Sequence, residues 1–159
     1  PVHEEGAAYV DLETLLAAAD VVVVACPLTE ETRGLLDARR LALMKPTAFL
    51  VNVARGAIVD QDALVDALRD GRLAGAGLDV VDPEPLPAGD SLLALPNVVG
   101  APHSLGYTDE LLRGCVSGAC AALLACAAGE VPPEVANPDV LDNPLFVAKL
   151  ARFSQGGHR

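Results

Sequence analysis

The stretch Ala48-Phe49-Leu50-Val51-Asn52-Val53-Ala54-Arg55-Gly56-Ala57-Ile58-Val59-Asp60 decides the fold of this 159-residue chain. It begins with a mainly apolar run rich in β-branched residues, which is typical of a strand buried in a parallel sheet. Gly56 then turns the chain, and Asp60 is placed to cap a helix whose apolar residues recur at helical spacing. Arg55 therefore follows a strand at its carboxyl end, and this edge of an open α/β sheet is where ligands bind.

The same alternation of strand and helix extends outward from this stretch. Strand-like runs begin near residues 21, 48, 76 and 97, and helical patterns separate the first three. We expect a helix that Asp11 caps and that runs through Ala19, and one or two short helices over residues 30–44. Alternation of this kind predicts a parallel sheet whose strands are joined by right-handed crossovers.

The last part of the chain contains one long helical pattern. Thr108 is placed to cap it, and Gly129 is placed to end it. Its uncharged section, residues 115–128, is too short to span a bilayer, so we expect a buried or interface helix. From Val131 onward the prolines indicate a surface connection, and residues 154–159 indicate a frayed tail.

Two further polar residues follow predicted strands. Glu84 comes after the strand over residues 76–80, and His103 comes after the strand over residues 97–100. The prolines around Glu84 exclude a helix there, so we expect a stiff, extended segment. Because ligands bind at the carboxyl ends of parallel strands, we expect Arg55, Glu84 and His103 to converge on one crevice.

Composition narrows the class of partner and the compartment. The net charge of -11 and the sequence pI of about 4.5 argue against a nucleic acid or an anionic membrane. The four cysteines, at positions 26, 115, 120 and 126, lack metal-ligand spacing. We interpret them as free, buried thiols, and we expect no metal site and a reducing, cytoplasmic compartment.

Four motifs occur in order along the chain. They are Pro27-Leu28-Thr29 with Thr32, residues 52–60, Leu78-Asp79-Val80 followed by Glu84-Pro85, and Pro102-His103 with Gly106. Through these motifs the sequence from about residue 6 to about residue 137 resembles the D-isomer-specific 2-hydroxyacid dehydrogenases, which include phosphoglycerate, D-lactate and glyoxylate/hydroxypyruvate enzymes. Each motif alone is weak evidence, but the ordered set is strong.

The resemblance implies a fold class and a domain organisation. The fold is an α/β, Rossmann-like, doubly wound parallel sheet, apparently truncated at its N-terminal side, because the family's G-x-G-x-x-G pyrophosphate turn has no counterpart here. Residues 1–137 are then a partial NAD(P)-binding domain and residues 138–159 a C-terminal extension. A sheet without its first strands would expose the apolar edge of residues 21–24, so we expect the isolated chain to self-associate or to be marginally stable.

The resemblance also implies an activity and the residues that perform it. The reaction is reduction of a 2-oxo acid with NAD as hydride carrier, NADP not being excluded. Arg55 would bind the carboxylate, His103 would exchange a proton with the carbonyl oxygen, and Glu84 would orient the histidine ring. The expected partners are a small 2-oxo or 2-hydroxy acid and, in the full-length protein, a second copy of the chain. The expected cofactor contacts are Pro27, Thr32, Val53, Ala54, Arg55, Asp79, His103 and Gly106.

Simpler interpretations compete with these roles. Outside the motif, Arg55 would be an ordinary surface residue, His103 a loop histidine, Glu84 a solvated carboxylate and Asp79 a turn cap. Their joint presence favours an oxidoreductase. Two other functions remain open, namely a nonenzymatic NAD(H)-sensing corepressor or scaffold on the same fold, and an inactive fragment. The sequence does not specify which 2-hydroxy acid is used.

Overall fold

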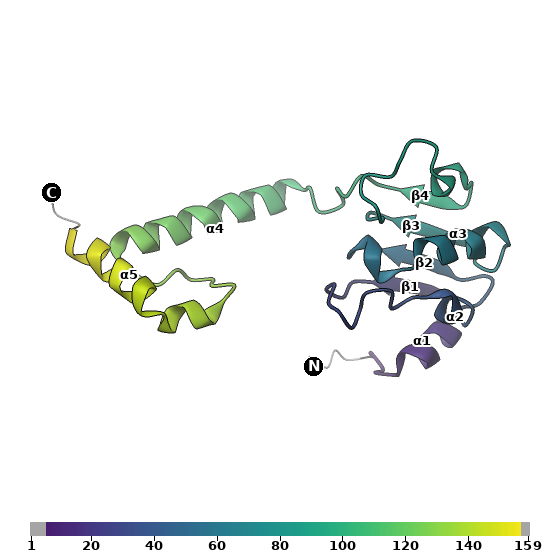
Figure 1. The fold of residues 1–159 in the computed structure, drawn as a ribbon, viewed down its shortest axis with the longest axis horizontal. Helices are drawn as coiled ribbons and strands as arrows, with labels where there is room; N and C mark the ends of the chain where they lie inside the picture. The colour runs from purple at the N-terminus through teal and green to yellow at the C-terminus, as the bar shows by residue number, and fades with distance from the viewer. Residues whose placement is uncertain (1–5, 157–159) are drawn as a thin grey trace. The chain divides into compact units, whose positions relative to one another are not determined.

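A computed structural model describes residues 6–156 of the chain, with side chains described through residue 154. The chain divides into two compact units, Pro1–Leu105 and Gly106–Arg159, and each is described here by itself. The first unit contains a four-stranded sheet in the order β1-β2-β3-β4, with every neighbouring pair parallel (Figure 1). The parallel α/β fold expected from the sequence is therefore confirmed. The strands are β1 (Val21–Val24), β2 (Phe49–Asn52), β3 (Gly75–Leu78) and β4 (Val98–Gly100).

The helices of the first unit begin where the sequence provides a cap. The Asp11 carboxylate accepts hydrogen bonds from the backbone N–H and the hydroxyl of Thr14, at 2.9 and 2.8 Å. These bonds hold the pKa of Asp11 below its ordinary value. Asp60 caps the next long helix by accepting the N–H of Ala63 at 3.1 Å. The helical elements are α1 (Leu12–Ala18), α2 (Ala38–Leu41), the 3₁₀ turn η1 (Gly56–Ile58), α3 (Gln61–Arg69) and the 3₁₀ turn η2 (Ser91–Ala94).

The structure has one short helix within residues 30–44, where one or two were expected. Only α2 is an α-helix there, while residues 30–34 form turns. Thr32 stabilises this turn, because its hydroxyl donates to the Pro27 carbonyl at 2.8 Å and accepts the N–H of Thr29 at 2.7 Å. Side-chain bonds of this kind compete with helix formation.

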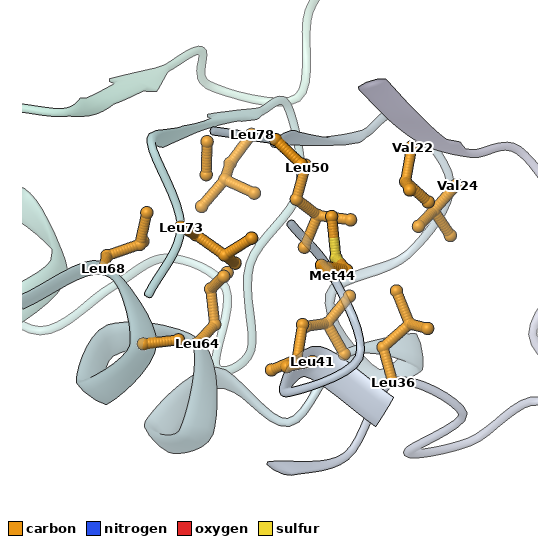
Figure 2. Packing of buried hydrophobic residues seen from close by; sticks show 14 of the residues in the cluster. Val22, Val24, Leu36, Leu41, Met44, Leu50, Leu64, Leu68, Leu73 and Leu78 are labelled. Atoms are coloured by element: carbon orange, nitrogen blue, oxygen red, sulfur yellow. The ribbon is translucent and has the colours of Figure 1, made fainter. Parts of the chain in front are cut away.

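The hydrophobic core lies on one face of the sheet. Val22, Val24 and Leu50 point inward and pack with the buried leucines of α2 and α3 (Figure 2). The alternate residues Val21 and Val23 on β1 are 54% and 57% exposed. Since successive strand residues point to opposite faces, the other face of β1 is open in this unit.

The second unit consists of helices. Thr108 caps α4 (Asp109–Ala128), and Gly129 ends it in the left-handed region at φ 76°, as the sequence predicts. The surface connection expected from Val131 onward is wrong in part, because this segment contains the 3₁₀ turn η3 (Pro138–Asp142) and the helix α5 (Pro144–Gly156). Pro144 occupies the first helical position, where proline's missing N–H has no intrahelical partner to lose. Residues 157–159 of the expected frayed tail lie outside the described part.

The α4 helix corrects two expectations. None of its residues is buried within the described structure, so the buried alternative for residues 115–128 is wrong. All four cysteines are free, as expected, but Cys115 and Cys120 are exposed and Cys26 and Cys126 only half-buried. The whole helix has 20 residues and is, by length and composition, long and apolar enough to cross a membrane. Length and composition do not distinguish such a helix from one that packs against protein.

Candidate functional site

The site is built around a contact between Glu84 and His103. Glu84 Oε1 lies 2.7 Å from Nδ1 of the His103 ring, and the two side chains remain 42% and 44% exposed. Glu84 is placed in the loop after β3, and both of its neighbouring prolines follow cis peptide bonds. A carboxylate on Nδ1 fixes the orientation of the ring and leaves Nε2 as the nitrogen available to a ligand. In the described residues no hydrogen bond occupies Nε2.

Asp79 holds the backbone turn that carries His103. The φ of His103 is 54°, in the left-handed region that is uncommon for residues with a side chain. The Asp79 carbonyl accepts the His103 N–H at 2.9 Å, and the Asp79 carboxylate accepts the N–H of Ser104 at 2.8 Å and that of Leu105 at 3.3 Å. A backbone conformation of this kind persists where its surroundings hold it in place. Asp79, which is only 6% exposed, therefore fixes the backbone conformation of the turn that carries His103.

Arg55 is presented by a second turn at the same edge of the sheet. It lies three residues after the end of β2, and its side chain is exposed. Its guanidinium donates one hydrogen bond to the Ala54 carbonyl at 2.6 Å, which leaves its other donors available to an anion. The sequence-predicted Arg55, Glu84 and His103 thus all stand at the carboxyl edge of the sheet. The described contacts join Glu84 to His103, and none joins Arg55 to either.

Close contacts brace the Arg55 turn against the loop that carries Glu84. A Cβ on Gly56 would lie 2.0 Å from the Val81 carbonyl oxygen, so only glycine fits this approach. The side chain of Gln61 accepts the N–H of Asp82 at 3.0 Å. Both contacts were missed in the sequence analysis, because each joins segments more than twenty residues apart.

The residues expected along a cofactor occupy this edge or its surroundings. Val53 is 40% exposed immediately after β2, while Ala54 is buried. Pro27 is exposed in the loop after β1, and Thr32 is half-buried with its hydroxyl bonded to that loop. Asp79 uses its carboxylate to accept backbone N–H groups of the His103 turn, which agrees with the alternative interpretation of Asp79 as a turn cap. Gly106 lies in the second unit, and its placement relative to these residues is not described.

A cavity of about 650 Å³ opens beside the histidine–glutamate pair. Glu84, His103 and Asp79 form its polar wall, and Arg55 is not part of its lining. Most of the remaining wall is apolar, so Glu84 and His103 are partly exposed to solvent and border an apolar surface. Ligand pockets combine apolar walls with a few polar groups in the same way. The apolar lining includes Leu78, Val81, Leu86, Leu92, Leu93 and Val98.

These features define a class of protein: a parallel α/β domain with a candidate ligand site at the carboxyl edge of its sheet, where a histidine–glutamate pair and an arginine stand. The family described as "D-isomer specific 2-hydroxyacid dehydrogenase, NAD binding domain" matches residues 1–104. The chain belongs to this family, as the sequence motifs indicate.

Individual relatives agree with this membership. A glyoxylate reductase of Thermococcus litoralis is 47% identical over 139 residues, which cover 87% of this chain and 42% of the relative. The NAD-complexed D-isomer specific 2-hydroxyacid dehydrogenase of Lactobacillus delbrueckii ssp. bulgaricus is 35% identical, with a TM-score of 0.75 over 80% of this chain and 43% of that chain. A D-isomer specific 2-hydroxyacid dehydrogenase of Xanthobacter autotrophicus Py2, solved with NADPH and MES, is 41% identical, with a TM-score of 0.69 over 81% of this chain and 52% of that chain. The chain thus spans about half the length, or less than half, of the relatives that it matches.

Proposed function

We propose that the chain supplies the acid–base histidine and the carboxylate-binding arginine of an NAD(P)-dependent enzyme that interconverts 2-oxo acids and D-2-hydroxy acids. The observation that carries the proposal is the 2.7 Å contact between Glu84 Oε1 and His103 Nδ1. A histidine oriented by a carboxylate is a recurring arrangement for general acid–base catalysis, because the second ring nitrogen then faces the reacting group.

The chemistry divides among three side chains. Arg55 would pair its free guanidinium donors with the substrate carboxylate. His103 would donate the Nε2 proton to the carbonyl oxygen during reduction and take it back during oxidation, while Glu84 holds the ring. When bound, the reduced nicotinamide cofactor supplies the hydride that the carbonyl carbon needs.

The chain's residues fit one end of such a cofactor. The exposed apolar side chain of Val53 lies at the carboxyl edge of the sheet and suits the flat face of a nicotinamide ring. Pro27, Thr32 and Ala54 would complete the contacts expected along it. The 159-residue sequence contains no G-x-G-x-x-G stretch, so these residues account for the nicotinamide end alone.

The names of the relatives and the arginine of the site support one substrate class. The Thermococcus litoralis relative is a glyoxylate reductase, and a second relative, from Enterobacter agglomerans, is a glyoxylate/hydroxypyruvate reductase B. We therefore propose a small 2-oxo acid of the glyoxylate or hydroxypyruvate type. We also propose a cytoplasmic location and an NAD(P)-binding domain that extends to about residue 137.

The full-length protein is proposed to form a homodimer through the apolar surface of α4. Leu123 and Leu124 are each 71% exposed on this helix. Their replacement together by glutamate should lower the mass measured by analytical ultracentrifugation from dimer to monomer. An unchanged mass would argue against α4 as the interface.

The test of function begins with binding. NADH and NADPH are titrated calorimetrically into the 159-residue chain, and into the complete gene product if that is longer. Saturable binding is followed by a reduction assay with glyoxylate, hydroxypyruvate and 3-phosphoglycerate. Turnover that requires His103 supports the proposal. Cofactor binding without turnover of any 2-oxo acid would favour the nonenzymatic sensor.

A further inference from the structure

Asn52 is a buried polar residue at the last position of β2. It is 1% exposed, and among the described residues only Asp79 is another buried polar or charged side chain. Burying an amide costs free energy unless each of its polar atoms has a hydrogen-bond partner. The partners of Asn52 therefore indicate what this position contributes.

Both partners of the Asn52 side chain lie in the turn that carries Arg55. Nδ2 donates to the Arg55 carbonyl at 2.9 Å, and Oδ1 accepts the N–H of Ala54 at 3.0 Å. The Arg55 carbonyl also accepts the N–H of Ile58 at 3.3 Å, whereas Asn52 is the only partner described for the Ala54 N–H. One buried amide thus closes the turn and fixes the backbone from which the guanidinium extends.

The main chain of Asn52 continues this connection toward the histidine. Its carbonyl accepts the N–H of Asp79 at 3.0 Å, and the Asp79 carbonyl accepts the N–H of His103 at 2.9 Å. The turn of Arg55 and the turn of His103 are therefore connected through the buried residues Asn52 and Asp79. The Asn52 side chain accepts and donates hydrogen bonds in the first turn, and the Asp79 side chain accepts them from the second.

We infer that Asn52 is a positioning residue of the proposed 2-oxo acid site: its side chain sets the direction of Arg55 and so determines how well the substrate carboxylate is bound. The inference rests on the proposed function. Asn52 touches neither substrate nor cofactor and acts through Arg55. A substitution at Asn52 should therefore impair carboxylate binding while leaving the His103 turn, which is held by Asp79, intact.

The test is a double-mutant cycle between Asn52 and Arg55 in the complete protein. Asn52→Ala should raise the KM for glyoxylate about tenfold or more when Arg55 is present, and less than about twofold in an Arg55→Ala background, because residues that act as one unit are not additive. Asn97→Ala is the matched control, because the Asn97 amide also bonds backbone carbonyls, those of Leu68 and Ala74. This control should leave the KM unchanged.

A second variant and a second readout cover the case in which Asn52→Ala does not fold. Asn52→Asp keeps an acceptor for the Ala54 N–H but loses the donor to the Arg55 carbonyl, and it should raise the KM in the same Arg55-dependent way. Hydrogen exchange of the Ala54 N–H measures the hydrogen bond to Asn52 and requires no enzymatic activity. This exchange should be faster in Asn52→Ala than in the wild type. Equal effects of the Asn52 substitutions with and without Arg55, or unchanged Ala54 exchange, overturn the inference. If the wild-type protein reduces no 2-oxo acid, both the proposed function and this inference are overturned. This outcome is distinct from failure of the inference alone, because Arg55→Ala then has no turnover to change.

Discussion

Glu84 Oε1 and His103 Nδ1 lie 2.7 Å apart although 19 positions separate the two residues in the sequence. The contact forms because β3 and β4 are parallel neighbours, so the segments that follow them leave the sheet at the same edge. It gives the histidine one orientation, and the proposed proton transfer at Nε2 depends on that orientation.

Removal of the Glu84 charge should impair catalysis more than stability. Glu84→Gln keeps the size of the side chain but allows its amide to donate to Nδ1. This bond favours the His103 tautomer that carries its proton on Nε2 and cannot accept the proton of the 2-hydroxy acid during oxidation. We expect kcat to fall by about 10²-fold or more, since an equivalent change in a catalytic triad has an even larger effect. Steady-state kinetics and a thermal melt measure the two quantities. Glu130→Gln, in the second unit, is the control, and an equal loss in both variants would contradict the assigned role.

Arg55 should control substrate binding in a way that lysine cannot replace. Arg55→Ala should raise the KM for glyoxylate about 10- to 100-fold and also lower kcat, because a charged hydrogen bond is worth about 1.5–3 kcal/mol. Arg55→Lys should recover only part of this loss, since an ammonium group lacks the planar fork. Initial-rate kinetics over a range of glyoxylate concentrations measure the effect. Full recovery by lysine would show that charge alone is required.

Gly56 should tolerate no side chain. Gly56→Ala places a Cβ 2.0 Å from the Val81 carbonyl oxygen, so the turn or the Glu84 loop must move. We expect a loss of about 1–3 kcal/mol in the free energy of unfolding, as for other overpacked sites. Gly77→Ala is the control, because its nearest contact beyond its chain neighbours, a methyl group of Val51, would be an ordinary 3.8 Å. Urea titrations compare the two, and equal stabilities would argue against the close approach.

The open edge of β1 should make the isolated chain self-associate. Val21 and Val23 leave an apolar surface on an edge strand, which is a template for pairing with another chain. Val23→Lys should reduce the mass-average molecular weight at a given concentration, because a charge on an edge strand opposes pairing. Light scattering after size exclusion measures it. A wild-type chain that is a monodisperse monomer and melts cooperatively at high temperature would contradict the predicted self-association.

Features set by local sequence could be predicted, and features set by long-range pairing could not. Asp11, Asp60, Thr108 and Gly129 end or begin helices as expected, because a cap depends on a few neighbouring residues. The helix α5 was missed because the prolines before it, together with Pro144 at its first position, suggested a connection rather than a first helical turn.

The site divides in the same way. Arg55, Glu84 and His103 were predicted as site residues from their positions after strands and from the sequence motifs. The hydrogen bonds of the Asn52 side chain were not predicted, and for Asp79 a turn cap was stated only as an alternative without its partners. A polar residue at the end of a buried strand shows its partners only after the strands are paired. A polar residue inside an apolar run was the available signal.

The kcat for glyoxylate reduction by the complete protein, compared between wild type and His103→Ala, tests the central claim most directly. We expect the substitution to lower kcat by about 10²- to 10⁴-fold, the contribution of a positioned general acid, while calorimetry finds the Kd for NADH nearly unchanged. Equal turnover by the two proteins would contradict the account, because His103 would then not be the proton donor.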